Sequence, residues 1–133
     1  MPETAAGQIS TALDRLVSGD LDGALAAASG TVETAAAAVA STRDADSFQQ
    51  KVKVAIDAVG RLGALQDQLV SLGWKPERAS MLCNNLRGTL NQAAVVMQVL
   101  RSDMSDVHGA KPVLEPIVYD ALKLASILVS FMK

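Results

Sequence analysis

The sequence predicts an all-α protein: an elongated antiparallel bundle of four or five helices in a single domain spanning residues 1–133. Half of the residues are hydrophobic, mainly Ala, Leu and Val, and only four are aromatic. Ala and Leu favour helices, whereas strands are richest in β-branched and aromatic residues. Between residues 48 and 104, two long stretches with apolar residues at heptad-like spacing are separated only by Gly73-Trp74-Lys75-Pro76. This pattern predicts a helical hairpin.

The first helix is expected over about residues 3–17. Ile9, Leu13 and Leu16 fall on one side of it, at spacings of four and three. The segment Ser18-Gly19-Asp20 then ends this helix. It is the optional member of the bundle because it is short.

The second helix starts after Asp20, whose side chain is a favourable N-cap. It is rich in alanine, with nine alanines in residues 24–40, so a neighbouring helix can approach it closely. Gly23 and Gly30 each weaken it by about 1 kcal/mol relative to Ala, which means that tertiary packing must hold it. The next break is expected at residues 41–44, with Asp44 or Asp46 as the following N-cap.

A third helix is predicted over residues 48–72, because one apolar stripe is sustained for some 25 residues. Gly73 stands where a left-handed residue commonly ends a helix, and Pro76 is well suited to the first turn of the next one. The stripe consists of Phe48, Val52, Ala55 or Ile56, Val59, Leu62, Leu65, Leu69 and Leu72.

The fourth helix is predicted over residues 77–104, where apolar residues recur at spacings of three and four. Asn84, Asn85, Gly88 and Thr89 are weak helix formers and favour a break near Gly88. The apolar period nevertheless keeps its phase through this stretch, and we therefore expect one uninterrupted helix. The stripe consists of Ala79, Leu82, Leu86, Leu90, Ala93, Met97, Leu100 and Met104.

The segment from Leu69 to Ala79, an apolar helix end followed by Gly73-Trp74, resembles the start of a ubiquitin-associated-type three-helix module. Leu82, Gly88, Leu90, Ala93 and Met97 then stand where that module has its second helix, its glycine turn and its third helix. The resemblance covers about 40 residues, around 65–101. It implies a turn at Gly88 and a ubiquitin-contacting surface with Gly73 and Trp74. The chain departs from the family at Leu72, usually Met there, and at Thr89, usually Asn.

The last helix is expected to begin at Pro112 or Pro116, after a loop over residues 105–112. Its apolar arc is wide, which predicts a helix that is central in the bundle or half buried in a partner. One seam consists of Leu114, Val118, Ala121, Ala125, Leu128 and Met132, and the adjoining seam of Val113, Ile117, Leu124, Ile127 and Phe131.

Charge is unevenly distributed along the chain. Residues 1–46 carry seven acidic and two basic side chains, whereas residues 47–102 carry seven basic and three acidic ones. Acidic and basic helices are expected to pack side by side, with a bipolar docking surface as the alternative. The net charge of −2 gives no general attraction to nucleic acid, so no nucleic-acid partner is expected.

The location expected from the sequence is cytoplasmic. The N-terminus lacks the basic start and apolar stretch of a secretory signal. Residues 117–132 are apolar, but polar residues interrupt them and they are shorter than the ~20 residues that a membrane span needs. Cys83 is the only cysteine, which excludes an intramolecular disulfide. Because it lies on the apolar face of a predicted helix, it is expected to be a small buried hydrophobe.

No motif for catalysis, metal binding or cofactor binding is found, so we expect a protein that is not an enzyme and has no cofactor. His108 is the single histidine and falls in a loop. Asp103 and Asp106 lie near it, but a helix end running into a polar turn explains this group better than a cation site. The glycine patterns that hold phosphates and the Glu-x-x-His pairs of di-iron bundles are absent from the sequence.

These observations favour a non-enzymatic protein–protein interaction module, such as a scaffold, adaptor or assembly subunit, that docks through helix faces. The partner is expected to be a protein, and a second copy of this chain is one candidate. A contrasting hypothesis is a membrane-surface-binding or pore-forming bundle that uses the apolar C-terminal helix. Trp74 either covers the end of the bundle or anchors a partner. The partner-binding residues predicted are Trp74, Ile117, Leu124, Ile127 and Phe131.

Overall fold

The computed structural model describes residues 5–41, 46–104 and 115–133, and these ranges fold into six helices with no strand. The prediction of an all-α helical bundle is confirmed, but the described residues form six helices and not the expected four or five. The helices run along the chain as α1 (Ala5–Val17), α2 (Leu21–Val39), α3 (Phe48–Val59), α4 (Arg61–Ser71), α5 (Pro76–Met104) and α6 (Glu115–Ser130).

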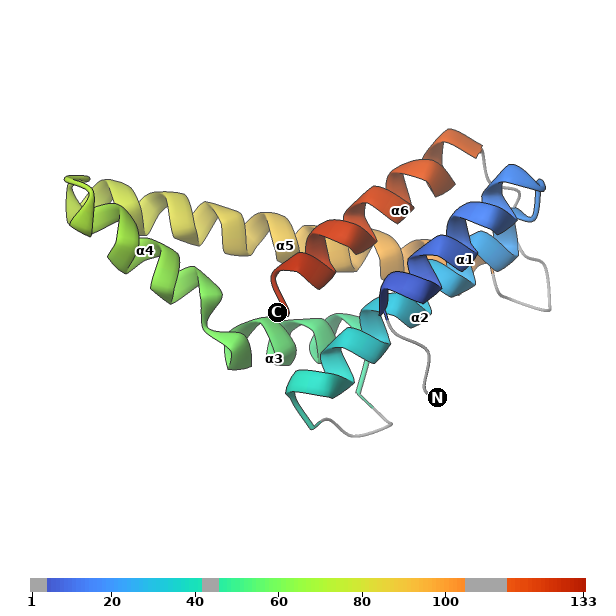
Figure 1. Ribbon diagram of the computed structural model, residues 1–133, viewed down its shortest axis with the longest axis horizontal. Coiled ribbons are helices and arrows are strands. Elements are labelled where there is room, and N and C mark those ends of the chain that lie inside the picture. Colours follow the sequence, from blue (N-terminus) through green and yellow to red (C-terminus); the bar gives the residue numbers. More distant parts are fainter. Residues whose placement is uncertain (1–4, 42–45, 105–114) are drawn as a thin grey trace.

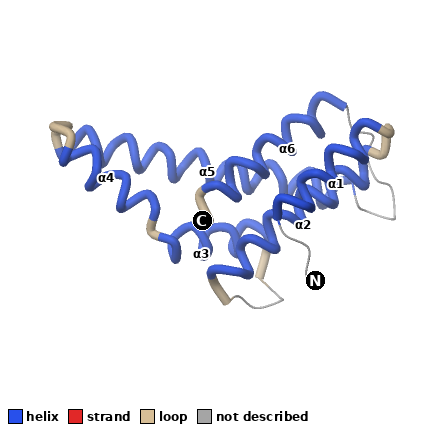
Figure 2. The backbone as a smooth tube through the Cα atoms, viewed as in Figure 1, coloured by secondary structure: helices blue, strands red, loops and turns tan. Residues whose placement is uncertain are grey.

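The helices are arranged as a head and an arm (Figure 1). The head contains α1, α2, α3, α6 and residues 88–104 of α5, and α2 packs against each of the other four helices. The arm contains α4 and residues 76–87 of α5, which run antiparallel and extend to one side of the head (Figure 2). Among the described helices, α4 packs mainly against α5. The arm is therefore held mainly by one helix–helix contact, whereas the core of the head is built from contacts among five helices.

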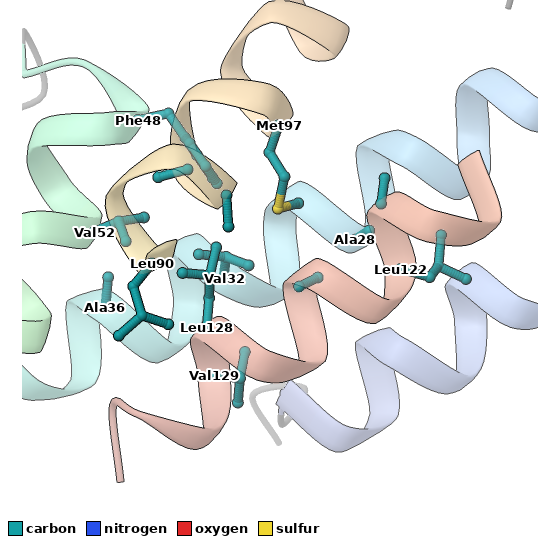
Figure 3. Packing of buried hydrophobic residues seen from close by; sticks show 14 of the residues in the cluster. Ala28, Val32, Ala36, Phe48, Val52, Leu90, Met97, Leu122, Leu128 and Val129 are labelled. Carbon is teal, nitrogen blue, oxygen red and sulfur yellow. The ribbon is translucent and has the colours of Figure 1, made fainter. Parts of the chain in front are cut away.

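The core of the head forms where α2, α5 and α6 approach one another (Figure 3). Val32 of α2, Met97 of α5 and Leu128 of α6 are all fully buried there. Small residues on α2, such as Ala28 and Ala36, let the neighbouring helices come close. Burial of such side chains is the main stabilising contribution to a helical bundle, at about 25 cal/mol per Å² of apolar surface.

The helix ends at Gly19 and Gly73 follow the expected chemistry. At the second of these, Gly73 has φ of +102°, Trp74 N–H donates to the Leu69 carbonyl and Gly73 N–H to the Val70 carbonyl. This pair of bonds is a Schellman motif, which satisfies carbonyls that the helix leaves unpaired. The predicted N-cap at Asp20 is also confirmed, since its carboxylate accepts a hydrogen bond from Gly23 N–H.

The prediction of one helix over residues 48–72 was wrong, because the chain breaks at Gly60. Gly60 has φ of +69°, in the left-handed region that a residue without a Cβ adopts at little cost. The apolar stripe continues across this break, so spacing alone did not show it. The break turns α4 away from the head while α3 stays packed against α2 and α5.

The N-cap of α3 also differs from the prediction. Ser47 caps this helix, with its Oγ accepting a hydrogen bond from Gln50 N–H at 3.1 Å. Asp46 therefore is not the cap, and Asp44 lies outside the described residues. A serine hydroxyl immediately before the first apolar residue satisfies the free N–H groups of the first turn.

The prediction of one uninterrupted helix after Pro76 is confirmed, since α5 continues for 29 residues through Gly88. The turn at Gly88 that a ubiquitin-associated-type module needs is therefore not formed. Apolar contacts on both sides of Gly88, at Leu86 and Leu90, hold the helix together despite the weak helix formers around it. The last helix begins at Glu115, with Pro116 in its first turn, and Pro112 lies outside the described residues.

Candidate functional site

The end of the arm carries a group of exposed apolar side chains, which we call the arm tip. Leu72 is 79% exposed and Trp74 is 44% exposed. Much of the Trp74 side chain is therefore open to solvent. Met81 and Leu82 of α5 are also exposed. The arm tip consists of Val70, Leu72, Trp74, Met81 and Leu82.

Basic residues lie beside the arm tip. Lys75 and Arg78 are exposed, and neither makes an ion pair within the described part of the chain. Glu77 lies between them in sequence and is also exposed. The end of the arm therefore combines apolar side chains with a small excess of positive charge.

The seam between α4 and α5 explains how the arm keeps its shape. Ala79 and Cys83 are buried on the α5 side, and Leu65 and Leu69 are partly buried on the α4 side, whereas Leu62 at the base of the arm belongs to the core of the head. Cys83 thus lies where the sequence predicted it, as a small apolar side chain in a helix seam.

The C-terminal helix divides its two predicted seams between the core and the surface. In the first seam Val118, Ala121, Ala125, Leu128 and Met132 are buried. In the second seam Ile117 and Ile127 are exposed, whereas Leu124 and Phe131 pack partly against the core. Leu114 and Val113 lie outside the described residues.

The predicted partner-binding residues do not form one surface. Trp74 lies on the arm tip, whereas Ile117, Leu124, Ile127 and Phe131 belong to α6 on the head (Figure 1). Phe131 is held by Arg61 at the base of the arm, with the guanidinium carbon 4.8 Å from the ring centroid. The arm tip and the exposed residues of α6 are therefore two separate candidate surfaces.

Charge is partly paired between the acidic and basic halves of the chain. Arg101 of α5 forms an ion pair with Glu33 of α2, as the prediction of packed acidic and basic helices requires. Arg87 pairs with Asp57 at 2.6 Å, within the basic half. Several other basic side chains remain in solvent.

A cavity of about 280 Å³ lies on the head between α2 and the C-terminal part of α5. Ser29 contributes to its lining, and so do Asp22 and Glu33 on the same face of α2 and Arg101 of α5. Sequence reasoning missed this site. The available signal was the spacing of Asp22, Ser29 and Glu33 at seven and four residues, which aligns three polar side chains on one face of an alanine-rich helix.

Within residues 5–41, 46–104 and 115–133, no three His, Cys, Asp or Glu side chains gather closely enough to hold a metal ion. His108 and Asp106 lie outside these ranges. None of the described helices has the length and apolarity that crossing a bilayer requires.

Comparison with known proteins gave no match to a family model, a curated protein or a solved structure.

Proposed function

We propose that this chain is a non-enzymatic protein-docking module and that the arm tip is its contact element. The observation that carries the proposal is the exposure of five large apolar side chains at the end of a helical arm, outside the core of the head. Single exposed apolar residues are common on protein surfaces, but a group of them at one protruding point marks an interaction site.

The composition of the arm tip favours a protein partner with a specific chemistry. Trp74 is the residue type most often found as an interface anchor, and Leu72 beside it offers nearly its whole side chain for burial. Lys75 and Arg78 add positive charge at the rim. The partner surface that complements this tip is an apolar groove bordered by acidic side chains.

The arm is suited to present the tip in a fixed position. Helix α5 runs without interruption from the arm into the core of the head, a length of about 43 Å at 1.5 Å per residue. The Schellman motif at Gly73 fixes the turn that carries Trp74. A preorganised contact element loses less conformational entropy on binding than a flexible loop.

A selection from a displayed library of random 12-residue peptides tests this proposal. Peptides enriched on the wild-type chain are expected to combine apolar residues with Asp and Glu. Their binding is expected to fall at least tenfold in Leu72→Ser/Trp74→Ser, since an anchor side chain contributes about 2 kcal/mol or more. The matched control is Val17→Ser, which removes an apolar side chain that is 88% exposed on the head.

Other results of this experiment would contradict the proposal. Peptides that bind equally well to the wild type and the arm-tip variant would place the contact elsewhere, beginning with the exposed residues of α6. Two further measurements identify other occupants of the tip. Light scattering that shows a dimer lost in the arm-tip variant would identify a second copy of the chain. Sedimentation with phosphatidylglycerol vesicles that depends on the tip would identify a membrane surface.

A further inference from the structure

The cavity between α2 and α5 contains a buried hydroxyl that has no hydrogen-bond partner among the described residues. Ser29 is 2% exposed, and its Oγ makes no hydrogen bond with any residue that the structure describes. Other hydroxyls in these helices behave differently: Thr31 donates to the Ala27 carbonyl at 2.9 Å and Ser126 to the Leu122 carbonyl at 3.1 Å. Burial of an unpaired hydroxyl costs free energy, so Ser29 is a group that a ligand can satisfy.

Carboxylates stand on both sides of Ser29 along the same face of α2. Asp22 is two turns before it, about 10 Å along the helix axis, and Glu33 is one turn after it. Asp22 makes no ion pair among the described residues, whereas Glu33 accepts from Arg101. A carboxylate oxygen can accept more than one hydrogen bond, so Glu33 keeps the capacity to bind a second donor.

The floor of the cavity between these polar groups is apolar and open. Leu25 and Ala26 line it between Asp22 and Ser29. Gly30 also lines it, and a Cβ built on this residue would meet no described atom within 4 Å beyond the adjacent helix backbone. The space therefore suits a slender aliphatic chain that joins two polar ends.

We infer that this cavity binds a linear aliphatic diamine in its doubly protonated form. One ammonium group donates to Ser29 Oγ and the Glu33 carboxylate, and the other pairs with Asp22. The methylene chain lies against Leu25 and Ala26. Three charged side chains line the cavity, namely Asp22, Glu33 and Arg101. Arg101 pairs with Glu33, whereas Asp22 has no ion pair among the described residues, so the lining carries a net negative charge that favours a cation over an anion.

The test is a titration of the full chain at pH 7 and low salt with 1,6-diaminohexane, followed by amide chemical shifts in two-dimensional NMR. Saturable shifts are expected for residues 22–33 and for Arg101. Hexylamine is expected to bind about tenfold more weakly, because it lacks the second charge. Uncharged 1,6-hexanediol and MgCl2 are expected to give no saturable shifts at these residues.

Two variants and one control define the site. Ser29→Ala is expected to weaken diamine binding about tenfold without lowering the melting temperature, because the lost hydroxyl had no partner. Asp22→Asn is expected to reduce the affinity for the diamine to that for hexylamine. Asp14→Asn removes the same charge from the exposed face of α1 and is expected to leave binding unchanged.

The inference is overturned if no saturable shift occurs up to 10 mM diamine. Equal effects of MgCl2 or hexanediol, or unchanged binding in Ser29→Ala, would also overturn it. The site is independent of the proposed docking function, because the arm tip is on the opposite end of the molecule (Figure 1). The arm-tip variant Leu72→Ser/Trp74→Ser is expected to bind the diamine as tightly as the wild type does. Failure of the docking proposal would therefore not affect the diamine test.

Discussion

Arg61 and Phe131 connect the base of the arm to the end of the chain. The guanidinium carbon of Arg61 lies 4.8 Å from the centroid of the Phe131 ring, and Arg61 Nη1 donates a hydrogen bond to the Ser130 carbonyl. Arg61 is the first residue of α4, and Phe131 follows the last turn of α6. The direction in which the arm leaves the head is thus tied to the C-terminal helix.

Phe131→Ala is expected to lower the free energy of unfolding by about 2 kcal/mol, because the ring is partly buried against the core. A double-mutant cycle with Arg61→Ala should give a coupling energy of about 0.5–1 kcal/mol. The matched control is the Lys123–Tyr119 pair, at 4.5 Å on the exposed face of α6, where a smaller coupling is expected. Urea denaturation measures both cycles, and equal coupling in the two pairs would contradict a structural role for Arg61.

Gly60→Ala is expected to destabilise the chain by about 1–2 kcal/mol, because its φ of +69° is unfavourable for a residue with a Cβ. Gly88→Ala is the matched control, since Gly88 lies inside α5, and a Cβ at either glycine would meet no described atom within 4 Å beyond its local backbone. Gly88→Ala should stabilise by up to about 1 kcal/mol through helix propensity. If the urea midpoints of both variants move in the same direction, the left-handed conformation at position 60 does not require glycine.

Gly30→Ala should raise the free energy of unfolding by about 1 kcal/mol, since the new methyl group points into open space and Ala favours the helix. Gly23→Ala should give almost no net gain. A methyl group there would collide with the carboxylate of Asp20, which caps α2 by accepting from Gly23 N–H, and loss of this cap costs about 1 kcal/mol. Thermal melts compare the two variants. A clear gain in Gly23→Ala would mean that the Asp20 cap contributes little.

Leu128→Ala is expected to cost about 2–5 kcal/mol, because this side chain is fully buried where α2, α5 and α6 meet. Its neighbour Ile127 is 47% exposed, and Ile127→Ala should cost less than half as much. The two substitutions are one residue apart on the same helix, so their difference reports burial rather than helix propensity. Similar urea midpoints for both variants would contradict the orientation of α6.

The helical class and most of the helix ends follow from local features of the sequence. Ala-rich and Leu-rich periodicity specifies helices, and local chemistry at Asp20, Gly73 and Pro76 specifies where they start and stop. Continuity of the apolar stripe through Gly88 correctly predicted one long α5. These features depend on residues close in sequence, which is why they can be read from it.

The division into head and arm depends on contacts between helices that are distant in sequence. The apolar stripe passes through Gly60 as it passes through Gly88, yet only Gly60 takes a left-handed conformation and only there does the chain turn. The difference arises because α3 packs on α2 and α5 together, whereas α4 packs mainly on α5. Periodicity reports that a side chain is apolar, but not how many neighbours surround it.

The candidate sites likewise combine features set by local sequence with features set by long-range packing. The sequence indicated Trp74 and Ile117 as surface residues of interest, but only the fold separated them onto the arm tip and the head. The exposure of Leu72 and the cavity beside Ser29 depend on which helices cover them. Both result from long-range packing of α2, α4, α5 and α6, and no local pattern of residues encodes that packing.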